Sequence, residues 1–346
     1  MTRRLISFAL LLLILLVAFT SEASASVDVL WRQFKDRFIT SDGRVVDWQN
    51  RHISHSEGQG YALLLAVELD DPAAFARVLA WSDNNLGRGL RPWKWGHSQD
   101  GWRALDRNNA TDGDIFHAWA LLLAGKKWDN PSYTHEGFNI MEAIRHELVD
   151  EHQYLLPARW GFQYEGETRL NLSYYVFPAL RAFSEADPEH AAFWNAIYEK
   201  GLSLYHASLK NPAGLPPDWV SVDAKSGVLL PQGGRDANYG FEAIRIPLFL
   251  SWAHEKQALE PLRPFIERVA REGRIPQRIS LFNSEPLSEE EDVEGGIGHY
   301  ATLARAAQAL GMVQDADRLW RLADKSREIN QRNYYGEVLY LLSRIL

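Results

Sequence analysis

The sequence predicts an all-α fold, an (α/α)6 barrel of six inner and six outer helices with at most a minor β-hairpin. About twelve stretches of the chain repeat apolar residues at helical spacing. These stretches are of two kinds that alternate along the chain: some are apolar on nearly all sides, and the others are amphipathic. A helix that is apolar all round is buried, whereas a helix with a polar face lies outside. The alternation therefore predicts an inner and an outer ring.

The inner ring is assigned to the stretches that are apolar on nearly all sides, 60–69, 115–124, 174–183, 241–253, 297–310 and 337–346. The outer ring is assigned to the amphipathic stretches 27–38, 75–81, 133–148, 191–209, 262–272 and 315–325. Pro178 and Pro247 fall inside two inner stretches and should either kink these helices or mark late starts. Strand alternation is nearly absent, and 220–230 is the best candidate for a hairpin.

The links between these stretches also alternate. A link from an inner to an outer stretch is short, whereas a link from an outer to an inner stretch is long and rich in Gly, Pro and Trp, as in 86–111 and 209–238. All long links and all N-termini of the inner helices are thus expected at one end of the barrel. An α-solenoid is the alternative architecture, but the sequence has no fixed-period repeat.

The first 25 residues have the pattern of a secretory signal peptide. Arg3 and Arg4 precede the apolar run 5–19, and Ala23-Ser24-Ala25 has the small residues of a cleavage site. An uncleaved membrane anchor is the alternative, but the run is shorter than the roughly 20 residues of a membrane span. We expect a signal peptide over 1–25, a single (α/α)6 domain over 26–346, and a periplasmic or secreted protein with no stable membrane insertion after cleavage.

The composition excludes several classes of function. The formal charge of -8, without a basic cluster, argues against nucleic acid and anionic membranes as partners. The chain has no cysteine, so it must rely on a large apolar core. No metal-spaced His cluster, Gly-rich phosphate loop or G-x-S-x-G motif is present, so no metal and no cofactor are predicted. Thirteen Trp and thirteen Tyr supply flat faces that can stack on sugar rings.

Glu57 begins one of the inner stretches, in the segment Ser56-Glu57-Gly58-Gln59-Gly60-Tyr61. Complementation of the helix dipole would explain an acidic residue there. Gly58 and Gly60 favour a functional interpretation, because glycines weaken a helix and allow a ligand to approach the backbone. Glu57 is therefore a candidate general acid.

Asp112 and Asp114 begin the next inner stretch as an Asp-Gly-Asp pair. Asp112 is either a helix N-cap or a residue that binds sugar hydroxyls, and the local sequence does not distinguish between these two interpretations. A calcium site is a weaker alternative, because the spaced oxygen ligands of a calcium loop are missing.

Glu242 stands inside an apolar run, three residues before Arg245. A structural ion pair would explain the two residues, although buried pairs are costly. The functional interpretation is a general base kept ionised by Arg245. One carboxyl in apolar surroundings and one carboxylate paired with arginine are typical of glycoside hydrolysis.

Four segments together resemble glycoside hydrolase family eight: Ser56-Glu57-Gly58-Gln59-Gly60-Tyr61, Ala110-Thr111-Asp112-Gly113-Asp114, Asn171-Leu172-Ser173-Tyr174 and Glu242-Ala243-Ile244-Arg245. The resemblance runs from about Trp31 to the C-terminus and is closest to the exported cellulases encoded with bacterial cellulose synthases. It implies an (α/α)6 barrel and an inverting endo-β-1,4-glucanase without metal or cofactor. By their motif positions, Glu57 is the implied general acid, Asp112 the residue that holds the sugar, and Glu242 the implied general base.

The chain departs from the family pattern at two positions. Close relatives usually carry Tyr-Asp-Ala-Ile-Arg where this chain has Phe241-Glu242-Ala243-Ile244-Arg245. Glutamate keeps the charge but adds a methylene, and Phe241 lacks the tyrosine hydroxyl. Asp236 is an alternative base, but Glu242 holds the motif position.

Aromatic residues at the starts of inner helices are candidates for substrate contact. Trp93 and Trp95 lie in the link before Asp112, and Tyr174 and Tyr335 lie at other inner-helix starts. Barrel-mouth packing is the alternative for each of them. Arg245 completes the predicted binding residues.

The leading hypothesis is an endo-β-1,4-glucanase that acts on cellulose-type glucan, functionally associated with cellulose synthase machinery. A monomer is expected. Activity on xylan, chitosan or mixed-linkage glucan is the nearest alternative. A glycan-binding barrel with weak or lost catalysis is the alternative from another class, and the Glu242 departure motivates it.

Overall fold

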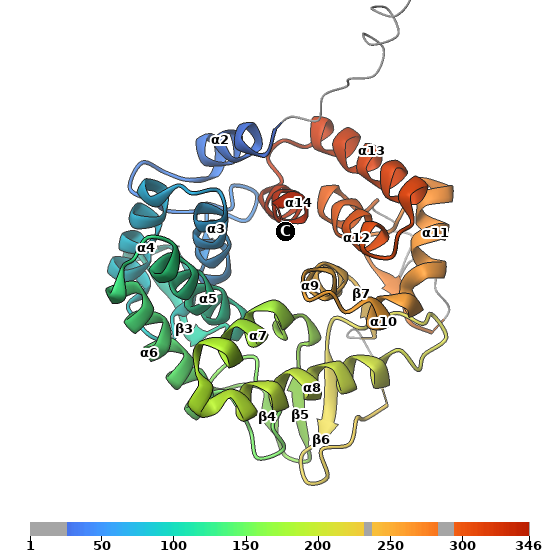
Figure 1. Ribbon diagram of the computed structural model, residues 1–346, viewed down its shortest axis with the longest axis horizontal. Helices are drawn as coiled ribbons and strands as arrows, with labels where there is room; N and C mark the ends of the chain where they lie inside the picture. Colours follow the sequence, from blue (N-terminus) through green and yellow to red (C-terminus); the bar gives the residue numbers. More distant parts are fainter. Residues whose placement is uncertain (1–25, 232–236, 283–293, 346) are drawn as a thin grey trace, which may run out of the picture.

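The structure is a computed structural model that describes residues 26–231, 237–282 and 294–345. Within these residues, six inner helices form a ring, as Figure 1 shows. They are α3 (Ser56–Glu68), α5 (Thr111–Lys127), α7 (Phe177–Ala186), α9 (Ile246–Trp252), α12 (Ile297–Ala309) and α14 (Tyr334–Ile345). Each inner helix contacts the next, and α14 contacts α3 and so closes the ring.

The outer ring alternates with the inner one along the chain. It contains α2 (Val27–Phe38), α4 (Pro72–Leu86), α6 (Pro131–Glu147), α8 (Ala191–Ser208), α11 (Arg263–Glu272) and α13 (Val313–Ile329). A short helix, α10 (Lys256–Leu259), connects α9 to α11. The predicted (α/α)6 barrel is therefore confirmed, and every predicted helical stretch overlaps a helix of the expected ring. The predicted signal peptide, 1–25, lies outside the described residues.

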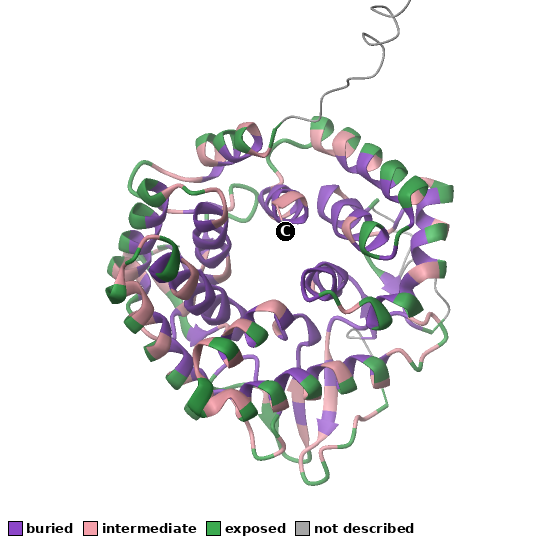
Figure 2. Ribbon diagram, in the orientation of Figure 1, coloured by how far each residue is buried: buried purple, intermediate pink, exposed green. Residues whose placement is uncertain are grey.

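The two kinds of helix differ in burial as their sequences require. Figure 2 shows α3 and α5 buried on nearly all sides, whereas the outer helices expose one face. In α2, for example, Leu30, Trp31, Phe34 and Phe38 are buried at helical spacing. One continuous apolar cluster includes residues from both rings. No helix in the described part of the chain is long and apolar enough to cross a membrane.

The two prolines mark late helix starts rather than kinks. Pro178 and Pro247 stand in the first turns of α7 and α9, where a missing N–H is tolerated. Glu242 consequently precedes a short 3-10 turn, η4 (Ala243–Arg245), that leads into α9.

The long links contain more strand than the single minor hairpin expected. In the described parts of these links, three small sheets have the strand orders β1-β2-β3, β4-β5-β6 and β7-β8. Their strands are β1 (Ser54–His55), β2 (Pro92–Ser98), β3 (Gly101–Asn109), β4 (Gln163–Tyr164), β5 (Glu167–Leu170), β6 (Val220–Asp223), β7 (Asn238–Tyr239) and β8 (Ile279–Ser280). Most of β3 is at least partly exposed. A ribbon without a covered face needs no apolar alternation, so the period-2 signal is missing from the sequence.

The predicted hairpin over 220–230 is present as a turn. Val222 pairs with Leu229 in an isolated bridge, and β6 also pairs with β5. The hairpin thus forms one edge of a three-stranded sheet.

Glycines let the starts of neighbouring inner helices touch. A Cβ on Gly58 would lie 2.3 Å from Tyr334 Oη, and a Cβ on Gly60 would lie 2.7 Å from Phe116 Cβ. A Cβ on Gly113 would lie 2.5 Å from Ser56 Oγ. The interpretation of Gly58 and Gly60 as openings for a ligand is therefore wrong: other inner helices fill the space that these glycines leave.

We predict that Gly60→Ala lowers the free energy of unfolding by about 1–3 kcal/mol, because overpacking forces two helices apart. The added methyl group would meet Phe116 Cβ and, at 3.2 Å, the carbonyl oxygen of Gly113, neither of which can turn away. Chemical denaturation followed by circular dichroism measures the change.

Gly298→Ala is the matched control on α12, where the nearest atom is Leu339 Cδ1, the end of a side chain, at 3.0 Å. It should be nearly neutral, since the better helix propensity of alanine offsets a small rearrangement. Equal losses in the two variants would contradict the helix-contact argument.

Candidate active site

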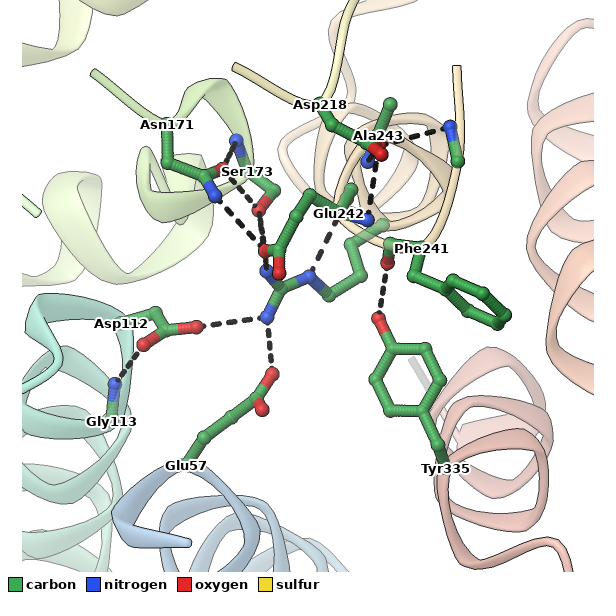
Figure 3. A network of polar contacts seen from close by, with 12 residues as sticks. Glu57, Asp112, Gly113, Asn171, Ser173, Asp218, Phe241, Glu242, Ala243 and Tyr335 are labelled. Atoms are coloured by element: carbon green, nitrogen blue, oxygen red, sulfur yellow. Dashed lines mark hydrogen bonds and ion pairs between the residues drawn. The ribbon is translucent and has the colours of Figure 1, made fainter. Parts of the chain in front are cut away.

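Three acidic side chains from distant parts of the chain meet at one end of the barrel. Glu57 lies in the first turn of α3, Asp112 in the first turn of α5, and Glu242 directly before η4. Figure 3 shows that their carboxyl groups point toward one another. The structure thus brings together the three acids that the sequence analysis grouped.

The guanidinium of Arg245 joins the three carboxyl groups. Its Nη1 donates to Asp112 Oδ2 at 2.8 Å and to Glu57 Oε1. Its Nη2 donates to Glu242 Oε2 and, at 2.6 Å, to Ser173 Oγ. The side chains of Arg245 and Asp112 are 2% exposed, whereas those of Glu57 and Glu242 are 21% and 31% exposed. The first two side chains form the floor of the site, and the two glutamates are open to a ligand.

One positive charge faces three acidic groups in this cluster. Three ionised carboxylates around one guanidinium would leave two uncompensated negative charges in largely buried surroundings, which is costly. Burial, and next the charge of Glu57, raise the pKa of Asp112, while Arg245 opposes the rise. Burial lowers the pKa of Arg245, but the charges of Glu242 and its neighbours outweigh this effect and raise it well above its usual value. The cluster therefore keeps a charged arginine, and burial opposes the ionisation of Asp112.

The two oxygens of Glu242 have different surroundings. Oε2 accepts from Arg245 and, at 3.0 Å, from Asn171 Nδ2. The amide of Asn171 is itself fixed, because its Oδ1 accepts from the backbone N–H and the hydroxyl of Ser173. Among the described residues, Oε1 has no hydrogen-bond partner, and no dashed line ends on it in Figure 3. Glu242 is therefore anchored through one oxygen, and its side chain is 31% exposed.

Glu57 is held by a neighbour on its own helix. Tyr61, one turn later on α3, donates from its hydroxyl to Glu57 Oε1 at 2.6 Å. Arg245 Nη1 also lies 3.3 Å from this hydroxyl. The side chain is thus fixed through Oε1, as Glu242 is fixed through Oε2.

Asp112 is not the N-cap of α5. The capping position belongs to Ala110, which makes no side-chain cap, and Asp112 lies inside the first turn with Oδ2 on Arg245. Asp114 has a structural environment instead: its carboxylate accepts from the backbone N–H of Arg91 and from Asn109 Nδ2. Burial raises the pKa of Asp114 to about 7. No group of residues in the described part of the chain is arranged to hold a metal ion.

The predicted aromatic contacts fall into two groups. Trp93 is half-buried and stacks on His55, the residue before α3, with ring centres 5.9 Å apart. Tyr174 lies against the Arg245 guanidinium at 5.6 Å, and the Tyr335 hydroxyl donates to the Phe241 carbonyl at 2.6 Å. Tyr174 and Tyr335 therefore border the acidic cluster, and Trp93 lies beside the residue that precedes α3.

The prediction of a substrate contact at Trp95 is wrong. Its side chain is only 8% exposed and packs against Trp81, Trp102 and the guanidinium of Arg44. Trp95 supports the β2–β3 ribbon, and the exposed ring beside it belongs to Trp102.

The sequence analysis missed several side chains that shape the site. Asn171 and Ser173 stood in a recognised motif, but their contact with Glu242 was not predicted. Tyr61 follows Glu57 by four residues, a spacing that places both on one face of the helix and could have been used. Asp218, which contacts the backbone around Glu242, had no local signal. Asp236, the alternative base, lies outside the described residues.

A cavity of about 420 Å³ lies beside the cluster. Phe241 and Tyr335 line it together with polar side chains that include Gln277, His299 and Asn333. Aromatic faces with hydrogen-bonding groups around them suit a sugar ring.

Comparison with known proteins identifies the same family as the motifs do. The family model of "Glycosyl hydrolases family 8" matches residues 5–345. An endoglucanase of Cellulomonas uda is 36% identical over 72% of this chain and 70% of its own length. An endoglucanase of Salmonella typhi is 32% identical over 88% of this chain and 85% of its own length. The crystal structure of endoglucanase Cel10 of Klebsiella pneumoniae, 32% identical, superposes with a TM-score of 0.72 over 87% of this chain and all of that chain.

The buried imidazole of His117 makes the stability of the protein depend on pH. Its side chain is fully buried one turn into α5, with Nδ1 2.8 Å from the carbonyl oxygen of Gly113 and Nε2 unpartnered. Burial lowers its pKa to about 3. Below the unfolded-state pKa of about 6.5, His117 is protonated in the unfolded chain but stays neutral in the folded protein. The free energy of unfolding therefore decreases as the pH falls.

We predict that the stability of the wild type relative to His117→Leu falls by about 2 kcal/mol between pH 7.5 and pH 5. Groups that titrate in both proteins cancel in this difference. Urea denaturation of the two proteins at several pH values measures it, and parallel stability curves would show that the imidazole takes up a proton in the folded state.

Proposed function

We propose, because the chain belongs to glycosyl hydrolase family 8, that it is an endo-β-1,4-glucanase that cleaves cellulose-type glucan with inversion. The observation that carries this proposal is the pair of accessible glutamates on one buried guanidinium, with one oxygen of Glu242 that no described residue binds. The endoglucanases similar to this chain support the polymer and the endo mode.

In the proposed reaction Glu242 is the general base and Glu57 the general acid. Oε1 of Glu242 takes a proton from a water molecule, whose oxygen attacks the anomeric carbon from the face opposite to the leaving sugar. Glu57 donates its proton to the glycosidic oxygen as that bond breaks. Arg245 holds the carboxyl groups of both residues, so that the acid and the base are fixed relative to each other.

Asp112 and the aromatic residues serve binding in this scheme. The Asp112 carboxyl at the floor of the site accepts hydroxyl groups of the sugar at the cleavage point. Tyr174 and Tyr335, which border the cluster, and Trp93, which stacks on His55, offer apolar faces to neighbouring sugar rings in this proposal. Arg245 orients the acids and contacts the substrate from below.

The finer biological assignment rests on the sequence motifs. We propose a periplasmic or secreted monomer that trims β-1,4-glucan during cellulose synthesis and export, in functional association with the synthase machinery. The resemblance to cellulases encoded with cellulose synthases supports this role, and the pattern of residues 1–25 supports export. N-terminal sequencing of the exported protein tests cleavage near Ser26.

A glycan-binding barrel with little catalysis is the second candidate. The observation that favours it is the longer side chain of Glu242 at the position where relatives usually carry aspartate. An active wild type would exclude this candidate.

The first prediction for this function concerns turnover. Purified protein should rapidly lower the viscosity of carboxymethyl-cellulose and release reducing ends faster than from xylan or chitosan. Glu57→Gln and Glu242→Gln should each reduce turnover by roughly 100-fold or more, because each removes a proton-transfer group. Proton NMR of the first products should show the α-anomer, as inversion requires.

Retained turnover in Glu57→Gln would disprove the acid assignment. Binding of the glucan without release of reducing ends by the wild type would establish the glycan-binding alternative. Initial release of the β-anomer would exclude inversion.

A second prediction concerns Asn171. Asn171→Ala should lower kcat roughly 10-fold or more with little change in KM, because a hydrogen bond to a charged group contributes about 1.5–3 kcal/mol. The variant leaves Glu242 Oε2 held by Arg245 and by the longer contact of 3.4 Å from Ser173 Oγ. Asn211→Ala is the matched control. Asn211 Nδ2 donates hydrogen bonds to two backbone carbonyl oxygens after α8, those of Ser208 and Leu215. Equal kcat values in the two variants would contradict the orienting role of Asn171.

A further inference from the structure

Asp218 is a buried carboxylate that the proposed reaction does not use. It lies in the long link between α8 and η4 and is 8% exposed. Its Oδ1 accepts three backbone N–H groups, those of Gly240 at 2.9 Å, Glu242 at 3.1 Å and Ala243 at 2.9 Å. Figure 3 shows this carboxylate beside the turn that carries Glu242.

These three amides would otherwise lack partners. The first N–H groups of a helical turn have no acceptor within the turn, and Glu242, at the capping position of η4, makes no side-chain cap. Successive N–H groups that point to one place form an anion-binding concavity. Asp218 fills this concavity from a segment 24 residues earlier in the sequence.

Two further features fix the contact between Asp218 and this turn: a backbone hydrogen bond of Asp218 and the close approach of its carboxylate to Gly240. The backbone N–H of Asp218 donates to the carbonyl oxygen of Asn238 at 2.8 Å. A Cβ on Gly240 would lie 2.5 Å from Asp218 Oδ2 and 2.8 Å from Asn238 Oδ1. Position 240 is therefore restricted to glycine by the approach of this carboxylate.

The anchoring acts on the backbone of Glu242, whereas Asn171 and Arg245 act on its side chain. A side chain with three rotatable bonds reaches a defined place only if both ends are held. With the N–H of Glu242 fixed and Oε2 bound, the remaining freedom of Oε1 is small. Displacement of a catalytic group by about 1 Å can cost roughly 100-fold in rate.

We propose that Asp218 is a positioning residue that holds the backbone of Glu242, and thereby aims Oε1 of the base at the reacting water. This inference rests on the proposed function, in which Glu242 is the base. Asp218 acts through the backbone of the turn, because its Oδ1 accepts the N–H groups of Gly240, Glu242 and Ala243.

The test compares Asp218→Ala and Asp218→Asn with the wild type on carboxymethyl-cellulose. Alanine removes the acceptor and should lower kcat roughly 10- to 100-fold while KM changes less than about twofold, since the binding residues keep their places. Asparagine keeps an oxygen where Oδ1 lies and should recover most of kcat. A group that itself served as the base would not be rescued by an amide.

Asp150→Ala is the matched control. Asp150 Oδ1 also accepts two backbone N–H groups, those of His152 at 3.0 Å and Tyr154 at 2.8 Å, in a loop that does not carry the base. This variant should lower the melting temperature without changing kcat. A fall of kcat in Asp150→Ala equal to that in Asp218→Ala would reduce the role of Asp218 to stability and overturn the inference.

Gly240→Ala disturbs the same contact without removing the carboxylate, and it keeps the inference testable if Asp218→Ala does not fold. Its kcat should fall with KM unchanged. Unchanged kcat in Gly240→Ala, or Asp218→Asn as inactive as Glu242→Gln, would overturn the positioning role. An active wild type with a fully active Asp218→Ala would overturn this inference alone, whereas an inactive wild type would overturn the proposed function and the inference with it.

Discussion

The guanidinium of Arg245 is the constraint on which the rest of the site depends. A buried arginine is tolerated only with anionic partners and satisfied donors. Here the partners come from the starts of α3 and α5 and from the residue before η4, so one cation holds together three parts of the inner ring. The contact that stabilises the end of the barrel therefore also sets the distances among the acids. Folding and chemistry cannot be separated at this residue.

Close packing of the inner helices makes this convergence possible. Gly113 lets the start of α5 lie against Ser56 and the backbone of Glu57, and Gly58 lets Tyr334 of α14 approach the same turn. Larger residues would move the helix starts apart by the size of a methyl group or more. The carboxyl groups would then no longer reach one guanidinium. Gly58 and Gly113 thus affect the site by letting the helix starts approach one another, and not by contacting a ligand.

Local sequence patterns predicted the helices and the three acids, because these features depend on residues close together in the sequence. Apolar periodicity located both rings, because burial on all sides or on one side is recorded in every helix. Carboxylates in apolar runs located Glu57, Asp112 and Glu242. The contacts of Asp218 and Asn171 with Glu242 span 24 and 71 residues, and no local pattern records such a pairing. Trp95 was misassigned because the local sequence around an aromatic residue in a long link does not show what its ring contacts. Here the ring packs against Trp81 and Trp102 and not against a ligand.

The glutamate at position 242 is best understood from how its backbone is held. Its own N–H is bound by Asp218, and the preceding carbonyl oxygen, that of Phe241, accepts from Tyr335. A backbone held on both sides cannot retreat to make room for an extra methylene. The side chain must absorb the added length, and its Oε2 does so by reaching Arg245 and Asn171. Oε1 is then fixed by the same contacts, so the longer side chain stays directed at one place.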